Sequence, residues 1–258
     1  MTPYYEDANT TIYHGDCLEV LPTLKNVDLF ITSPPYNMGS SPWPHLGHWK
    51  PGDSAGGKSK WRNGSDGSGG VTYVEHEDKM PWDQYVGWQQ MVIEAMDDAL
   101  APAGAIFYNH KPRVIGGRLW TPLELIPADV GVELRQIVTW DRGGGMNFNP
   151  TAFVPQYEWI IVLARVAWRL KSKGVSGLGD VWRIHATPNP DHPAPFPLGL
   201  PARAIEATGP GLVVDPFMGS GTTLRAAMDA GVRSIGIERS ERYCEVAAQR
   251  LSQGVLAL

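Results

Sequence analysis

The turn at residues 32–36, Thr-Ser-Pro-Pro-Tyr, carries side chains suited to holding a planar amine. Ser33 offers a hydroxyl oxygen as one acceptor, and the restricted backbone of Pro34 and Pro35 can present the Pro34 carbonyl as a second. Tyr36 adds an aromatic face. Two acceptors for an NH₂ group beside a stacking ring match a nucleobase turned out of its helix, although such a tetrapeptide alone could also be a surface turn.

A second turn, Asp-Pro-Phe-Met-Gly-Ser-Gly-Thr-Thr at residues 215–223, has the features of a cofactor site. It stands between an apolar run and a helical pattern, so its small residues let a ligand approach a helix N-terminus. No Lys follows Gly221, which excludes a Walker phosphate loop. Glu238 ends the next apolar run, where a carboxylate can accept hydrogen bonds from both ribose hydroxyls. Asp215 would repel a pyrophosphate but attract an ammonium group, which favours S-adenosylmethionine over NAD.

These turns need a scaffold of alternating strands and helices, and the apolar patterns predict one. We expect strands at residues 12–14, 27–32, 105–108, 134–140, 159–164, 212–214 and 234–237. We expect helices at residues 18–24, 82–100, 222–230 and 241–251, and an extended proline-rich segment that runs to about residue 202. Because strands and helices alternate, the predicted fold class is α/β with a doubly wound sheet.

Taken together, the motifs resemble the amino-methyltransferases of DNA, the N6-adenine and N4-cytosine family, over most of the chain. The Thr-Ser-Pro-Pro-Tyr motif precedes the second turn, which is the order of the family's β class. Protein-glutamine and many RNA methyltransferases with a related Pro-Pro-Tyr turn have the opposite order. The resemblance implies a single domain over residues 1–258 with a Rossmann-like S-adenosylmethionine-dependent methyltransferase fold, a mixed seven-stranded sheet and a circularly permuted motif order.

The resemblance also implies a reaction: direct transfer of the methyl group of S-adenosylmethionine to the exocyclic amino group of cytosine (N4) or adenine (N6) in DNA. Serine at the first catalytic position favours cytosine, since adenine enzymes of this class more often carry Asp. The implied catalytic residues are Ser33, Pro34, Pro35 and Tyr36. The implied cofactor-binding residues are Asp16, Phe196, Asp215, Pro216, Phe217, Gly219, Ser220, Gly221, Thr222, Thr223 and Glu238. Residues 157–160 are expected to open a strand on the side of the target base.

Two segments are candidates for contact with DNA. Residues 165–191 form a short candidate target-recognition segment, because relatives of the β class usually recognise their target in this interval. Residues 37–80 form a Gly/Trp-rich insertion loop, which could contact nucleic acid or act as a linker. The basic candidates for DNA contact are Lys58, Lys60, Arg62, Arg142, Arg165, Arg169, Lys171 and Lys173.

Composition sets limits on the remaining functions. The 22 Lys and Arg against 27 Asp and Glu give a net charge of −5, which counts mildly against nucleic acid but allows a local basic face. No apolar run approaches the roughly 18 residues of a membrane span, and two distant cysteines fit a reduced cytoplasmic protein. We expect no metal, and we expect the histidines, His110 included, to be surface or packing residues. The expected partner is duplex DNA with a flipped target base. A homodimer, a cognate restriction enzyme, an RNA or single-stranded DNA substrate and a catalytically silent DNA binder all stay open.

Overall fold

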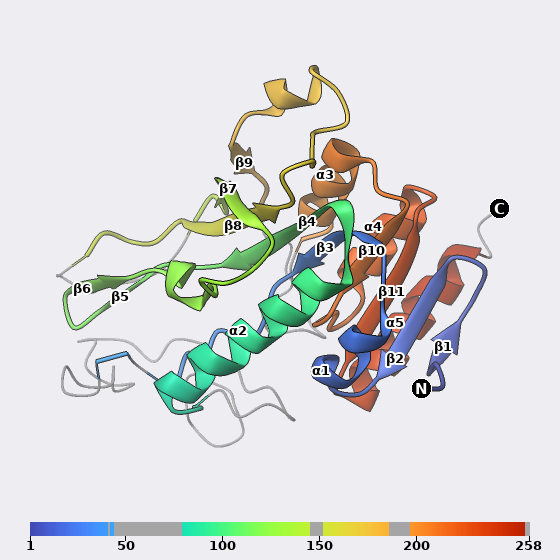
Figure 1. The fold of residues 1–258 in the computed structure, drawn as a ribbon, viewed down its shortest axis with the longest axis horizontal. Helices are drawn as coiled ribbons and strands as arrows, with labels where there is room; N and C mark the ends of the chain where they lie inside the picture. Colours follow the sequence, from blue (N-terminus) through green and yellow to red (C-terminus); the bar gives the residue numbers. More distant parts are fainter. Residues whose placement is uncertain (41, 44–78, 145–151, 186–196, 256–258) are drawn as a thin grey trace.

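A nine-stranded mixed sheet forms the centre of the molecule, with helices on both faces (Figure 1). The structure is a computed structural model that describes residues 1–40, 42–43, 79–144, 152–185 and 197–255. The strand order is β1-β2-β11-β10-β3-β4-β8-β7-β9. The strands are β1 (Tyr5–Glu6), β2 (Thr10–His14), β3 (Val27–Thr32), β4 (Leu100–His110), β7 (Glu133–Asp141), β8 (Tyr157–Ala164), β9 (Val181–Arg183), β10 (Leu212–Asp215) and β11 (Arg233–Glu238).

Shorter elements and helices complete the described fold. Strands β5 (Arg113–Ile115) and β6 (Arg118–Trp120) pair with each other as a separate hairpin. The α-helices are α1 (Cys17–Val20), α2 (Trp82–Ala99), α3 (Gly199–Thr208), α4 (Thr222–Asp229) and α5 (Glu241–Val255). Short 3-10 helices are η1 (Leu21–Thr23), η3 (Pro122–Leu125) and η4 (Val175–Leu178). None of the helices in the described ranges is long and apolar enough to cross a membrane.

The predicted α/β class and mixed sheet are confirmed, with two additional strands. Seven strands, β2, β11, β10, β3, β4, β8 and β7, form the expected sheet, and β1 and β9 extend its two edges. These edge strands have two and three residues, which is too short for an alternating pattern to show in the sequence. The helix expected at residues 82–100 is α2, while the strand expected at 105–108 is longer, because β4 spans Leu100–His110.

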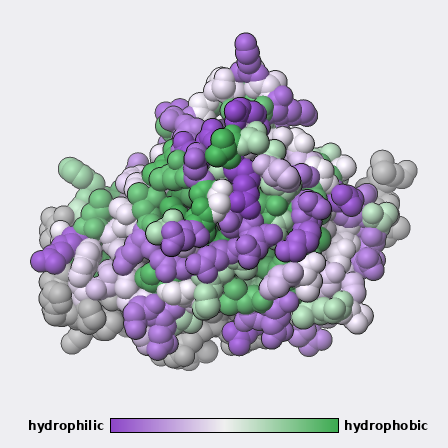
Figure 2. All heavy atoms as spheres, viewed as in Figure 1, coloured by the Kyte–Doolittle hydropathy of each residue, from purple (hydrophilic) through white to green (hydrophobic). Residues whose placement is uncertain are grey.

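Alternating side chains along the central strands build two apolar layers. Phe30 and Ile106 face α1 and α2 in one cluster, whereas Leu29, Ile31 and Phe107 pack with α3 and α4 in the other. Each side of the sheet is therefore covered, as the nearly continuous apolar runs require. Hydrophilic side chains run across the middle of the face in Figure 2. On α2, the exposed side chains include Asp83, Glu94 and Asp98.

Strand direction decides which residues meet at one edge of this sheet. Strands β2, β11, β10, β3 and β4 run parallel to one another, so their carboxyl ends lie at a common edge, which we call the carboxyl edge. Strand β8 is antiparallel to both β4 and β7, so β8 begins there and β7 ends there. Both predicted turns therefore lie at the carboxyl edge, the usual place for ligands in open α/β sheets.

Candidate active site

The Ser33–Tyr36 turn leaves the sheet directly after β3. Hydrogen bonds from two side chains, those of Tyr85 and Asn37, hold it in place. The hydroxyl of Tyr85, on α2, donates to the carbonyl of Pro35 at 2.9 Å. Asn37 has a positive φ of 52° and is fully buried, and its Nδ2 donates to the carbonyl of Met80 at 2.8 Å. The turn is thus fixed both by the helix beside it and by the far end of the 37–80 loop.

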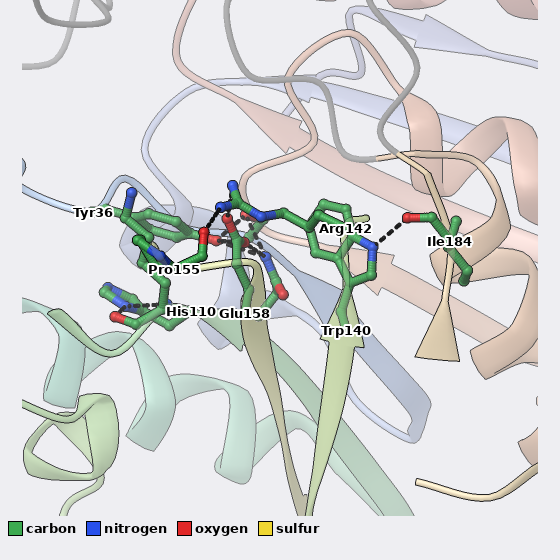
Figure 3. Close-up of polar contacts among 10 residues, drawn as sticks. Tyr36, His110, Trp140, Arg142, Pro155, Glu158 and Ile184 are labelled. Carbon is green, nitrogen blue, oxygen red and sulfur yellow. Dashed lines mark hydrogen bonds and ion pairs between the residues drawn. The ribbon is translucent and has the colours of Figure 1, made fainter. Parts of the chain in front are cut away.

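Four polar side chains converge at the tip of this turn, and we call Ser33, Tyr36, Asn109 and Glu158 the hydroxyl cluster. The Tyr36 hydroxyl lies 3.1 Å from Ser33 Oγ and donates to Glu158 Oε2 at 2.9 Å. Asn109 Nδ2 lies 2.6 Å from Tyr36 Oη, 2.9 Å from Glu158 Oε2 and 3.3 Å from Ser33 Oγ. Glu158 Oε1 accepts from Arg142 Nη1 at 3.1 Å, and Figure 3 shows this guanidinium extending over Glu158 toward the carbonyl of Pro155.

His110, the last residue of β4, supports the Tyr36 ring. The two ring centroids are 4.3 Å apart with an interplanar angle of 32°. Burial lowers the pKa of His110 to about 3, with Arg113 as the next cause, so the imidazole is neutral. Its Nδ1 accepts from the Lys111 backbone N–H at 2.9 Å, which leaves Nε2–H to face Tyr85 Oη at 2.8 Å. Tyr85 in turn donates to Pro35, so one chain of hydrogen bonds joins His110 to the turn.

The second turn places Asp215 in a dry setting between β10 and α4. Asp215 is 4% exposed, and its carboxylate accepts from the Thr223 hydroxyl at 2.6 Å and the Phe217 backbone N–H at 3.1 Å. Burial raises the pKa of Asp215 to about 6 although these hydrogen bonds lower it. Gly219 and Gly221 have φ values of 51° and 79°, which L-residues rarely adopt. The chain needs glycine at both places to turn into the helix.

Glu238 and Asp16 lie beside this turn because β11 and β2 are neighbouring parallel strands. Glu238 Oε2 accepts from the Gly219 N–H at 3.0 Å, and the Gly15 N–H donates to the Glu238 carbonyl at 3.0 Å. Asp16 caps α1 by accepting from the Leu18 N–H at 2.9 Å. Three carboxylates and a helix start fit a ligand that carries positive charge and a ribose, and they do not fit a polyphosphate. The residues present therefore fit S-adenosylmethionine.

The structure brings most of the predicted site together. All predicted catalytic residues, and all predicted cofactor-binding residues except Phe196, lie in the two turns or beside them at the carboxyl edge. Phe196, Lys58, Lys60 and Arg62 lie outside the described residues.

The basic candidates for DNA contact do not gather on one side. Arg142 lies at the carboxyl edge, next to Glu158. Arg165 follows the end of β8 at the opposite edge, where its guanidinium binds Asp97 at 2.9 Å and the Asp97 carbonyl at 2.6 Å. Arg169, Lys171 and Lys173 lie in the same stretch, and the Lys171 N–H donates to the carbonyl of Ala207, near the end of α3. The structure therefore separates these four residues from Ser33 by the length of the sheet.

Sequence reasoning gave no role in the site to three residues, Asn109, His110 and Glu158, although it expected the 157–160 segment on the side of the target base. His110 is a packing residue as expected, but what it packs against is the catalytic turn. Each of the three is a polar residue, almost fully buried, at the end of an apolar strand, and that position is the signal that could have revealed them.

Comparison with known proteins agrees with this geometry. Residues 27–249 match a family model described as DNA methylase. The type II methyltransferase M.ScaI of Streptomyces caespitosus is 27% identical over 96% of this chain and 83% of its own length. M.BglII of Bacillus subtilis is 26% identical over 93% of this chain and 68% of its own.

Solved structures share the fold at lower sequence identity. The cytosine-N4-specific PvuII DNA methyltransferase has a TM-score of 0.70 at 18% identity, over 97% of this chain and 93% of its own. A protein from Thermus thermophilus named as a DNA modification methylase, solved with S-adenosyl-L-methionine, has a TM-score of 0.62 at 21% identity, over 96% of this chain and 95% of its own. The predicted Rossmann-like methyltransferase fold is confirmed.

Proposed function

The chain belongs to the DNA methylase family, whose members are N6-adenine and N4-cytosine methyltransferases, and we propose that it methylates an exocyclic amino group in duplex DNA. The observation that carries the proposal is the pairing of two sites at one edge of the sheet. One is the Ser33–Tyr36 turn with its hydroxyl acceptors, and the other is the group of carboxylates that includes Asp215 and Glu238.

In the proposed reaction the base is turned out of the duplex and its amino group is held by acceptors. Ser33 Oγ and the Pro34 carbonyl take the two amine hydrogens, which directs the nitrogen lone pair outward. The base stacks on Tyr36, whose ring is backed by the neutral imidazole of His110. Turning the base out costs a few kcal/mol, which stacking and edge contacts offset.

The methyl donor would be held by the acidic side of the site. Asp215 pairs with its ammonium group, and Glu238 accepts hydrogen bonds from its ribose hydroxyls, with Asp16 on the neighbouring strand. When bound, S-adenosylmethionine would supply an electrophilic methyl group. The amino nitrogen would bond to this methyl group as its bond to sulfur breaks, S-adenosylhomocysteine would leave, and one amine proton would pass to solvent. The chain's own contribution is to position the amine and to exclude water.

The family resemblance of Ser33 favours cytosine as the target base. Two parts of the chain are proposed to contact the DNA around it. The 37–80 loop is closed at its base beside the catalytic turn by the Asn37–Met80 hydrogen bond. The 165–191 segment returns to the carboxyl edge at Arg183, where β9 pairs with the end of β7.

The first test is nucleoside mass spectrometry of DNA from a methylation-free bacterial host that expresses the chain. We expect a new N4-methylcytosine peak that is absent with Ser33→Ala or Asp215→Ala. A peak of N6-methyladenine would support the same class of enzyme and identify adenine, not cytosine, as the target base. Methyl incorporation into RNA or single strands but not into duplex DNA would refute the proposal, and so would soluble protein that binds S-adenosylmethionine and modifies no nucleic acid.

A further inference from the structure

We propose that Glu158 sets the direction of the hydrogen bonds in the hydroxyl cluster, so that Ser33 Oγ meets the target amine as an acceptor. The inference rests on the proposed function, because it assigns a reason for one of its steps. A serine hydroxyl can either donate or accept, and only the acceptor orientation is useful against an NH₂ group. The structure contains an arrangement that removes this ambiguity.

The hydrogens of the cluster can be counted. Asn109 Nδ2 carries two, and the hydroxyls of Tyr36 and Ser33 carry one each. Glu158 Oε2, an acceptor only, takes the Tyr36 hydrogen and one from Asn109, at 2.9 Å in both cases. Tyr36 Oη then takes the second Asn109 hydrogen at 2.6 Å and the Ser33 hydrogen at 3.1 Å. Asn109 Nδ2 also lies 3.3 Å from Ser33 Oγ, a longer contact that shares the same two amide hydrogens. Ser33 Oγ therefore keeps one lone pair for the target amine, and its own hydrogen points toward Tyr36.

The direction of this chain originates at the ion pair between Glu158 and Arg142. Glu158 is 6% exposed, and its second oxygen is 3.1 Å from the guanidinium, which has no acceptor to offer. Because a guanidinium can only donate, Arg142 requires an oxygen at the place that Glu158 Oε1 occupies. A carboxylate has a second oxygen to turn toward Tyr36, and this is what makes the hydroxyl hydrogen bonds run from Ser33 through Tyr36 to Glu158.

Replacing the carboxylate by an amide of the same shape would reverse the cluster. In Glu158→Gln, Arg142 takes the amide oxygen, and the NH₂ group faces both Tyr36 Oη and Asn109 Nδ2 as a donor. The Asn109 amide could rotate and accept the Tyr36 hydrogen through Oδ1, so the substitution is made in an Asn109→Ala background, which removes this alternative acceptor. The Tyr36 hydrogen then turns to Ser33 Oγ, and the Ser33 hydrogen points outward at the hydrogens of the target amine. Glu158 is thus a positioning residue, which acts on the amine through Tyr36 and Ser33.

The kinetic test adds Glu158→Gln to Asn109→Ala and compares it with Glu94→Gln in the same background, which removes the same charge from an exposed site on α2. Glu158→Gln is expected to lower kcat about 10- to 100-fold, the effect of opposing one buried donor to another, with less than twofold change in the KM for DNA. In a Tyr36→Phe background the same substitution is expected to have no further effect, because the link to Ser33 is gone. An unchanged kcat on adding Glu158→Gln to Asn109→Ala, or a full additional loss when Tyr36→Phe is also present, would overturn the proposal.

A second readout needs neither methyl donor nor DNA. Tyrosine labelled with carbon-13 at Cζ reports whether its hydroxyl donates or accepts, and the Tyr36 signal is identified by its loss in Tyr36→Phe. We expect this signal to move in Glu158→Gln and to stay in place in Glu94→Gln; an unmoved signal would refute the reversal. If the signal moves but the wild-type protein methylates no DNA, the proposed function fails while the cluster's direction holds. Should Glu158→Gln not fold, Tyr36→Phe itself is decisive, since wild-type kcat there would show that Ser33 needs no partner for its hydrogen.

Discussion

Replacing Asp215 by Asn is expected to make the ligand-free protein more stable at pH 7.5 while weakening its affinity for S-adenosylmethionine. Burial raises the pKa of Asp215 from its ordinary value of 3.8 to about 6. Each pH unit is worth about 1.4 kcal/mol, so the ionised carboxylate costs the folded state up to about 3 kcal/mol above pH 6. The Phe217 N–H keeps its acceptor in Asn, and the Thr223 hydroxyl can rotate to accept, so a gain of about 1–3 kcal/mol should survive.

The sign of the pH dependence follows from the raised pKa. Between pH 4 and 6 the folded protein binds more protons than the unfolded chain, so wild-type stability falls as the pH rises through this window. The advantage of Asp215→Asn should therefore be small near pH 4 and complete above pH 6. Urea unfolding at several pH values measures it, with Asp129→Asn, at an exposed position, as the matched charge control.

The same substitution should weaken binding at least tenfold in calorimetric titration with S-adenosylmethionine, because a charge-assisted contact is lost. Two results would refute the free-energy cost assigned to the buried, ionised Asp215 carboxylate. One is an Asp215→Asn variant no more stable than wild type at pH 7.5, and the other is a gain in stability at pH 4.5 as large as that at pH 7.5. Unchanged affinity would refute the pairing of Asp215 with the ammonium group.

Three further predictions follow from particular contacts. Tyr36→Ala should lower kcat/KM for DNA about 10- to 100-fold with little change in the Kd for S-adenosylmethionine, and equal losses in both would contradict the stacking role. Gly221→Ala should lower the free energy of unfolding by about 1–3 kcal/mol, because φ is 79° there and an added Cβ would lie 2.9 Å from the Ala247 Cβ; urea unfolding tests this. Arg165→Gln should reduce stability by about 1–2 kcal/mol by breaking the partly buried pair with Asp97, yet leave the salt dependence of DNA binding unchanged; a shallower salt slope would show a phosphate contact instead.

The parts of the site that the sequence could predict are those in which one short segment carries all the chemistry. Residues 32–36 and 215–223 each join the end of a strand to a turn, so the local pattern is enough to expect both the turn and its ligand. Strand β3 and helix α2 could be predicted from local patterns too, because β3 is a short apolar run and α2 repeats its apolar residues at helical spacing.

The hydroxyl cluster could not be predicted, because it depends on how strands pair. Asn109 is the last residue but one of β4, and Glu158 is the second residue of β8. They meet only because these two strands are antiparallel neighbours, with Asn109 opposite Ile160. Nothing in the spacing of residues 109 and 158 encodes that register. The position of Arg165 could not be predicted from its charge either, because a count of basic residues does not say at which edge of a sheet each one lies.

The hydrogen bond between Asn37 and Met80 bears on how such an enzyme could change its target. The two residues are 43 positions apart, yet Asn37 Nδ2 and the Met80 carbonyl are 2.8 Å from each other, with Arg113 donating to the Asn37 carbonyl at 3.3 Å. Closing a loop at its base costs little more when the loop is longer, since the entropy grows only with the logarithm of its length. We therefore expect the span between these residues to tolerate changes at little cost to the fold. Its length and sequence can be exchanged, in evolution or in the laboratory, while the residues that hold the amine remain where β3 and β4 place them.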